Sequence, residues 1–304
     1  LVDLLRVLGD PTRLRIVAVL RHAELTVGEL TRVTGLSQPR VSRHLKLLCD
    51  AHVLQRTRDQ NEVYYRVTVD GDRRRLTHDV FDSLPGDDPE IASDLDKLDT
   101  ILNERQVRAR ELLADLGVSP LDTDSIHEVG ATVEKLLRDR IPMAEDSDRV
   151  GDLLDIGTGT GSMLRLLGPR AKRAVAVDRS REMRLVARAR VSFDGLTNCT
   201  VQEGDMYSLN FPRQSFDLVT MDRVLGTAER PGEAIEQAAA VLKKDGHLLV
   251  VETAGSRVDE EKLGSWVRKA GLTPVETSES SHGTVLVALA ERKTCPEGPL
   301  SHGD

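Results

Sequence analysis

The chain has 304 residues, of which 39% are hydrophobic and 30% are charged, and its formal net charge is −8. This length predicts two or three domains, and no apolar run approaches the roughly 18 uncharged residues that a membrane-spanning helix needs. The charge is uneven, because residues 1–75 carry +5 and the remainder carries −13. The negative net charge excludes a protein that binds polyanions over its whole surface. The positive charge of the N-terminal segment indicates a local nucleic-acid site.

The three cysteines, Cys49, Cys199 and Cys295, lie far apart and form no CxxC pair. This usage predicts a reducing compartment and no disulfide framework. The first residues contain no cationic segment followed by an apolar one, so we expect no signal peptide. A cytoplasmic protein is therefore expected.

Short helices are predicted along the first 35 residues. Asp10-Pro11 interrupts the first helix, because the residue before proline disfavours the helical backbone. A second helix is expected over 12–21. Thr26 and Glu29 then have the spacing of a capping box, in which each side chain binds the backbone of the other residue. The helix that begins there is expected to end near Gly35.

The next predicted helix covers 38–49, with Ser37 as its N-cap, and it has two chemically different sides. Apolar residues Val41, Leu45 and Leu48 fall on one side. The other faces carry Gln38, Arg40, Ser42, Arg43 and Lys46. Glutamine can bind both edge atoms of adenine, and arginine both acceptors of guanine. The helix therefore suits the major groove of DNA.

Two strand-like segments follow, 53–57 and 63–69, with turn residues at 58–61 between them. The hairpin carries basic and aromatic residues in alternation: Arg56, Arg58, Tyr64, Tyr65 and Arg66. Such a wing could reach the neighbouring minor groove or the phosphate backbone. For any one residue a solvated surface helix explains the charges equally well. Helix, turn, helix and wing in this order instead favour a DNA-binding domain.

The segments DPTRLRIVAVL and LTVGELTRVTGLSQPRVSRHLKLL, followed by the wing, resemble the ArsR/SmtB repressors over about residues 1–70. The resemblance implies a winged-helix homodimer that binds double-stranded operator DNA. It also implies that Ser37, Gln38, Arg40, Ser42 and Arg43 face the DNA. Arsenic-sensing members carry a cysteine pair before the turn, whereas this chain reads AELTVGEL there. Without those thiols we expect no metal site.

Further helices are predicted over 73–84, 90–116 and 125–140, with a polar linker at 117–124 between the last two. Ser125 and Glu128 again have capping-box spacing. The helix at 90–116 is amphipathic, and by resemblance its apolar positions would help to pair two subunits.

From residue 151 the pattern changes to alternating strands and helices, which predicts an α/β domain. The strand candidates are 152–156, 174–177, 199–202, 217–221 and 247–251. A further helix over 258–270 precedes two closing strands, 273–276 and 284–290.

The segment DLLDIGTGTGSML places Gly157, Gly159 and Gly161 between a strand and a helix. Glycines let the backbone turn tightly and approach a ligand closely. A dinucleotide fingerprint would need glycine at Ser162, and a phosphate loop would need Gly-Lys-Ser/Thr. Neither pattern is present, so the loop indicates a different ligand.

Acidic residues follow the successive strands at the end where open α/β sheets bind ligands. Asp155 lies at the end of the first strand, Asp178 at the end of the second and Asp222 after the fourth. At the position of Asp178 a carboxylate can bind two ribose hydroxyls. Asp205-Met206 follows the third strand, within reach of an adenine if the sheet is doubly wound. This acidic lining suits a cofactor with an adenosine, a cationic sulfonium and a carboxylate better than it suits NAD.

This ordered set resembles the class I methyltransferases that use S-adenosyl-L-methionine (SAM), over about residues 150–290. The resemblance implies that SAM or S-adenosyl-L-homocysteine binds here. Asp155, Gly157, Thr158 and Gly159 would flank its methionine part, with Gly161 in the same loop. Asp178 would hold the ribose, with Arg179 beside it. Asp205 and Met206 would contact adenine, and Asp222 would lie beneath the sulfonium.

Together these features predict an α/β fold with an α+β winged helix-turn-helix, a long linker helix and a C-terminal Rossmann-like methyltransferase domain. The predicted ranges are 1–84 for the DNA-binding domain, 85–149 for a helical dimerisation and linker region, 150–290 for the methyltransferase-like domain and 291–304 for a flexible tail.

Catalytic residues are not assigned by the sequence. Repressors of this type fused to methyltransferases usually carry a His-Tyr pair where this chain has Gly226 and Thr227. His127 could serve as a base, although a histidine near a helix start is more often a cap or a surface residue. The segment after VVETAG is short and offers little cover for a substrate.

Three functions remain open at this point. The chain could be a regulator whose operator affinity responds to SAM or its product. It could be a small-molecule O-methyltransferase whose winged helix only dimerises, although the basic, groove-facing residues argue against this. It could also be an active methyltransferase that regulates its own operon and has a small-molecule methyl acceptor. None of the three needs a membrane.

Overall fold

The computed structural model describes residues 2–68, 80, 88–118, 126–141, 150–253, 255–279 and 285–292. These residues belong to two compact units. The first unit comprises the described residues of Leu1–Pro120, Gly159–Gly161 and Ser180–Glu203, and the second comprises those of Leu121–Thr158, Ser162–Arg179 and Gly204–Asp304. The units cut across the ranges predicted from sequence, and those boundaries stay a prediction. The helix predicted at 73–84, the cap at Ser125 and the tail beyond residue 292 lie largely outside the described residues.

The first unit begins with four short helices: α1 (Val2–Leu8), α2 (Pro11–Leu20), α3 (Val27–Thr34) and α4 (Gln38–Asp50). The local signals in the sequence explain where they start. The Asp10 carboxylate accepts a hydrogen bond from the Arg13 amide at 3.0 Å and caps α2. The capping box is confirmed, with Thr26 N to Glu29 Oε2 at 2.8 Å and Glu29 N to Thr26 Oγ1 at 3.3 Å. These bonds satisfy amides that the first turn of a helix leaves free.

The hairpin pairs β2 (Leu54–Asp59) with β3 (Glu62–Val67), and the short β1 (Leu25–Thr26) joins the other edge of β3. Asp59 lies opposite Glu62, so only Gln60 and Asn61 form the turn. The prediction of a four-residue turn over 58–61 was therefore wrong. Gln60 has a φ of 52°, which a two-residue hairpin connection commonly requires.

The long helix α6 (Pro89–Asp115) belongs to the first unit and buries apolar residues at two places along its length. Leu98 and Ile101 join the core formed by α1 to α4. Ala109 and Leu113 pack against Val186 and Ala189 of α10 (Arg181–Phe193). The apolar positions of α6 are thus largely covered within one chain, and its predicted part in pairing subunits stays a prediction.

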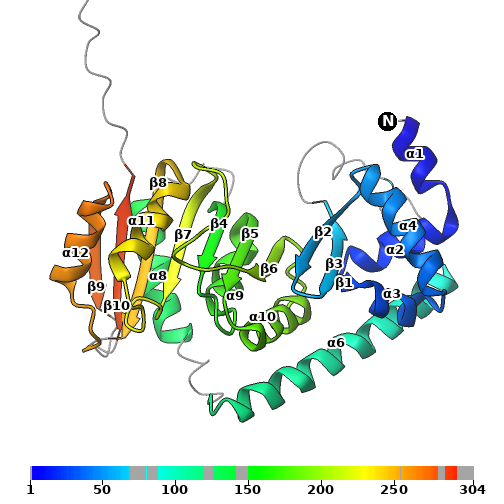
Figure 1. The fold of residues 1–304 in the computed structure, drawn as a ribbon, viewed down its shortest axis with the longest axis horizontal. Helices are drawn as coiled ribbons and strands as arrows, with labels where there is room; N and C mark the ends of the chain where they lie inside the picture. Colours follow the sequence, from blue (N-terminus) through cyan, green and yellow to red (C-terminus); the bar gives the residue numbers. More distant parts are fainter. Residues whose placement is uncertain are drawn as a thin grey trace, which may run out of the picture. The chain divides into compact units, whose positions relative to one another are not determined.

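The remaining elements form or flank a seven-stranded sheet (Figure 1). Its strands are β4 (Gly151–Ile156), β5 (Ala171–Asp178), β6 (Cys199–Glu203), β7 (Phe216–Asp222), β8 (Leu242–Thr253), β9 (Thr273–Glu279) and β10 (Val285–Glu291). The helices are α8 (Ile126–Arg140), α9 (Ser162–Leu167), α11 (Pro231–Val241) and α12 (Glu260–Lys269), with a 3₁₀ turn at Gly168–Arg170. Every strand predicted from the sequence is present.

The strand order is β6-β5-β4-β7-β8-β10-β9. β4 pairs in parallel with β5 and β7, and β7 with β8, whereas β10 pairs antiparallel with β8 and β9. The chain moves from β4 to β5 on one side and returns to β7 on the other. This reversal places a topological switch point beside β4, where open α/β sheets bind ligands at the carboxyl ends of the strands. Among the described helices, none is long and apolar enough to cross a membrane.

Candidate functional sites

The two sides of α4 differ as the sequence predicts. Val41, Leu45 and Leu48 are fully buried in the core of the first unit. The side chains proposed to face DNA are all exposed: Ser37, Gln38, Arg40, Ser42, Arg43 and Lys46. Burial of one face fixes the helix against α2 and α3 and leaves the other free to enter a groove. Contact of this face with DNA stays a prediction.

The three arginines predicted in the wing are in different environments. Arg56 and Arg58 are exposed, and Arg58 Nε donates to the Gln60 carbonyl at 3.0 Å. Arg66 is only 7% exposed, and its guanidinium donates to the Cys199 carbonyl at 3.4 Å and to Gln55 Oε1 at 3.3 Å. A guanidinium held in this way does not fit the predicted contact with DNA, so we remove Arg66 from the DNA-facing set.

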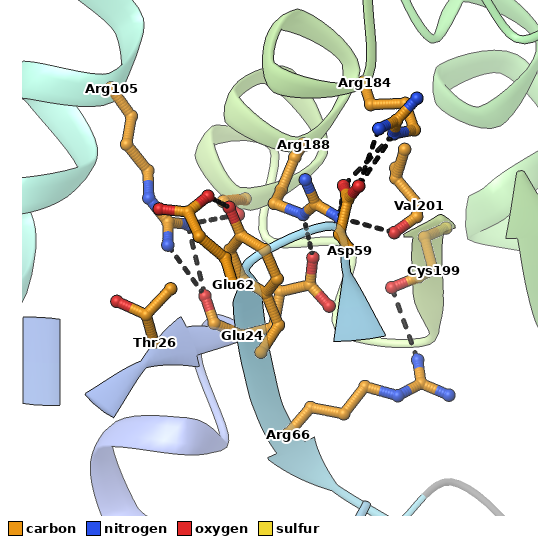
Figure 2. A network of polar contacts seen from close by, with 12 residues as sticks. Glu24, Thr26, Asp59, Glu62, Arg66, Arg105, Arg184, Arg188, Cys199 and Val201 are labelled. Atoms are coloured by element: carbon orange, nitrogen blue, oxygen red, sulfur yellow. Dashed lines mark hydrogen bonds and ion pairs between the residues drawn. The ribbon is translucent and has the colours of Figure 1, made fainter. Parts of the chain in front are cut away.

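The tip of the wing carries a buried ion-pair network, which we call the Asp59 network and which consists of Glu24, Asp59, Arg184 and Arg188 (Figure 2). Arg184 of α10 donates to Asp59 from Nη2 at 2.7 Å. Arg188, one turn later, reaches Asp59 at 3.0 Å and Glu24 at 2.6 Å. Asp59 is 7% exposed and Arg184 is 0% exposed. The wing tip therefore has its partners within the first unit.

Charge balance explains why these groups tolerate burial. Burial alone would raise the pKa of Asp59, but hydrogen bonds and charges from Arg184 and Arg188 outweigh it and hold the pKa below its ordinary value. The sequence analysis missed this network. Its only local signal is the spacing of Arg184 and Arg188, which places both on one side of α10, and nothing local points to a partner at Asp59.

The carboxyl ends of β4, β5 and β7 bring three acidic residues to one edge of the sheet. Asp155 at the end of β4 is 1% exposed and accepts a hydrogen bond from Thr220 Oγ1 at 2.6 Å. Burial raises the pKa of Asp155 to about 6; the hydroxyls of Thr158 and Thr220 oppose this shift, and the charges of Asp222 and Asp178 add to it. These acids are therefore close enough to influence one another, as predicted from their places in the sequence.

The loop after β4 has the backbone that its glycines predict. Gly157, Gly159 and Gly161 have φ values of 69°, 52° and 82°. A Cβ on Gly157 would lie 2.6 Å from Val224 Cγ2, so the loop depends on glycine at this point both for conformation and for space. Thr158 is buried beside it.

The other residues predicted to bind the cofactor differ in burial and in the contacts that they make. Asp178 is half-buried, and Arg179 is exposed. Asp205 Oδ1 accepts a hydrogen bond from the Tyr207 amide at 3.0 Å, which supports the turn in which it lies. Met206 packs against the core of the second unit. For Asp205 a role in the turn therefore accompanies the predicted contact with adenine.

Glu252 near the end of β8 is a further acidic residue that the sequence analysis did not single out. It is 2% exposed and accepts hydrogen bonds from the amides of Leu225 at 2.7 Å and Gly226 at 3.2 Å. Burial raises its pKa, and the two amides oppose that shift. Glu252 thus holds the loop after β7, next to Asp222. Its position at a strand end was the signal that could have identified it.

Among the described residues, no three histidine, cysteine, aspartate or glutamate side chains converge in a way that could hold a metal ion. His127, considered above as a base, has a side chain outside the described part of the structure.

Comparison with known proteins finds two family models that match separate parts of the chain. A family model described as bacterial regulatory protein, arsR family, matches residues 10–55, and a methyltransferase-domain model matches residues 154–250. The HTH-type transcriptional repressor SmtB of Mycobacterium tuberculosis is 39% identical over 82 residues, which are 27% of this chain and 58% of that protein. The uncharacterized methyltransferase YcgJ of Bacillus subtilis is 34% identical over 100 residues, 33% of this chain and 40% of that protein.

The chain thus spans between 40% and 58% of the length of these two relatives. The crystal structure of YcgJ from Bacillus subtilis aligns with 56% of this chain and 100% of that one, at 17% identity and a TM-score of 0.46.

Proposed function

Because this chain contains an arsR-family helix-turn-helix domain and a class I SAM-dependent methyltransferase domain, we propose that it is a DNA-binding regulator whose affinity for its operator changes when SAM or S-adenosylhomocysteine binds. A ligand can change that affinity only by the difference between its affinities for the two states of the protein. The active form is expected to be a homodimer on a two-fold operator.

The observation that carries the proposal is the exposed polar face of α4. Gln38, Arg40 and Arg43 are presented to solvent on a helix whose opposite face is locked in a core. Arginine and glutamine are the side chains that read guanine and adenine in the major groove. Lys46 and the wing arginines Arg56 and Arg58 add charge that favours the phosphate backbone.

The cofactor part of the proposal rests on the acidic edge of the sheet. The donor set fits a cationic adenosyl compound, because carboxylates can bind ribose hydroxyls and balance a sulfonium. We assign Asp155, Thr158 and the backbone at Gly157 to the methionine part, Asp178 to the ribose, and Asp222 to the sulfonium region. SAM, when bound, supplies an electrophilic methyl group. These residues bind and orient it, and the buried Asp155 places a negative charge beside the glycine loop.

One observation favours a second candidate, a small-molecule O-methyltransferase whose winged helix only dimerises. Asp59 and Arg66 are buried, so part of the wing makes contacts within the chain and does not present these side chains to DNA. The exposed face of α4 has no role in this alternative, which is why we rank it second.

Fluorescence anisotropy with a labelled duplex from the region directly upstream of the gene tests the proposal, over a salt series and with or without SAM and S-adenosylhomocysteine. We expect specific binding with a strong salt dependence, a change of affinity with one of the two compounds, and a loss of about 1–3 kcal/mol for Arg43→Ala.

Arg110→Ala, which removes an exposed arginine from α6, is the matched control and should bind DNA like the parent chain. Calorimetry should show that Arg43→Ala still binds SAM. Methyl transfer without specific DNA binding would establish the second candidate. Specific DNA binding that is indifferent to both compounds would refute the sensing role.

A further inference from the structure

A pocket in the first unit has no part in either proposed site. It lies between β3 of the wing, the start of α3, α6 and α10, and has a cavity of about 100 Å³ that opens to solvent. Four arginines line it, Arg105, Arg108, Arg181 and Arg188, against two glutamates, Glu29 and Glu62. The lining is therefore basic in a chain that is acidic as a whole.

Two of these arginines have carboxylate partners. Arg105 donates to both oxygens of Glu29 at 2.8 and 2.7 Å, so this pair is close to neutral. Arg188 binds Asp59 and Glu24 through Nη2 and Nε, and its guanidinium carbon lies 3.8 Å from the centre of the Tyr64 ring. Figure 2 shows Arg188 with its partners Asp59 and Glu24.

Three donor groups in the lining have no partner among the described residues. Arg188 Nη1 is buried and, among the described residues, has no hydrogen-bond partner. Leaving a buried charged donor unsatisfied is costly. Arg108 and Arg181 are exposed and make no hydrogen bond or ion pair within the described part of the chain. Of the two glutamates, Glu62 is engaged by the Tyr64 hydroxyl at 2.8 Å.

Apart from Thr26, the rest of the lining is apolar or aromatic. Ala109 and Leu112 of α6, Leu185 and Ala189 of α10 and the Tyr64 ring belong to this part of the lining. Small pockets with apolar walls and a few convergent polar groups are typical of ligand sites. An inorganic ion would leave these walls unused, and a cation such as SAM would meet an excess of positive charge.

From this arrangement we infer that the pocket binds a small organic carboxylate, with its apolar body against the apolar side chains that α6 and α10 contribute to the lining and its carboxylate toward Arg108, Arg181 and Arg188. The site is separate from the acidic edge of the sheet and does not rest on the proposed regulatory function. Because Tyr64 and Glu62 belong to β3, the bound molecule would touch the wing hairpin directly.

Calorimetry of the full chain with sodium benzoate tests the inference, with benzamide as the uncharged molecule of the same shape and inorganic phosphate as the bare anion, all at equal ionic strength. We expect one saturable benzoate site with a dissociation constant on the order of 1 mM, and at least roughly tenfold weaker binding of benzamide and phosphate. Arg108→Gln and Arg181→Gln should each weaken benzoate binding by roughly tenfold.

Arg110→Gln is the matched control, because Arg110 is exposed on the same helix and does not line the pocket; it should leave benzoate binding unchanged. Absence of saturable benzoate binding would overturn the inference. Equal binding of benzamide or of phosphate would overturn the assignment of an organic carboxylate. An equal loss in Arg110→Gln would show a diffuse effect of surface charge and no site. Thermal unfolding of each variant identifies any loss that comes from misfolding.

Discussion

Replacing Asp59 by asparagine removes one charge from the Asp59 network with almost no change of shape. Arg184, with no exposed surface, loses the carboxylate that it reaches at 2.7 Å, and Arg188 keeps only Glu24 as a carboxylate partner. Removing one partner of a buried ion pair costs about 3–5 kcal/mol. The asparagine oxygen can still accept one hydrogen bond, so we expect a loss of about 3 kcal/mol in the free energy of unfolding.

Urea unfolding followed by circular dichroism measures this loss. Asp99→Asn, at an exposed position of α6, is the matched control and should change stability by less than about 0.5 kcal/mol. Unfolding of a chain with two units need not be two-state. Hydrogen exchange of the β2 and β3 amides therefore provides the second measurement, and we expect their protection to fall in Asp59→Asn.

The pH dependence of the difference between parent and variant makes the test specific. The pKa of Asp59 in the folded chain is held below its ordinary value of 3.8. The stabilising contribution of the ionised carboxylate is therefore complete above the ordinary pKa and is lost as the pH falls through the lower, folded value. The stability difference should be constant between about pH 5 and 8 and should shrink below about pH 4. A loss under about 1 kcal/mol, or a difference that is unchanged in acid, would refute the ion-pair account.

Two further predictions concern the acidic edge of the sheet. Asp178→Ala should weaken SAM binding by about 1.5–3 kcal/mol, because the ribose hydroxyls lose a charged acceptor; calorimetry measures this, with the exposed Glu229→Ala as control, and equal affinities would remove the assigned role. SAM affinity should also fall as the pH drops below 6, because the pKa of Asp155 is raised to about 6 and a cationic ligand favours the ionised carboxylate. A flat profile between pH 5 and 8 would show that Asp155 stays ionised or does not face the cation.

Much of the local structure follows from the sequence alone. The Thr26–Glu29 capping box and the end of α3 near Gly35 were predicted from residues a few positions apart. Asp10-Pro11 was expected to separate the first two helices, whereas the capping role of Asp10 was not predicted. Ser37 also precedes α4 as expected, although its side chain makes no capping hydrogen bond with a described residue. Hydrogen bonds at helix ends join near neighbours, so local spacing is enough to identify them.

The buried face of α4 and the acids at the strand ends were also identifiable from sequence. Each depends on a periodicity or a strand end that one segment reveals by itself. Glu252 shows the limit of this reasoning. Its position at a strand end was visible, but the two amides that it binds lie 26 and 27 residues away.

Only the tertiary structure shows which side chains of the wing are buried and which residues they contact. Arg66 reads from sequence like Arg56 and Arg58, yet it is buried, because strand alternation turns its side chain toward Cys199, 133 residues further along the chain. Asp59 reads as a turn residue, and its arginine partners are 125 and 129 residues away. An ion pair forms where the fold brings opposite charges together. The positions of two distant residues in the sequence do not show whether the fold will bring them into contact.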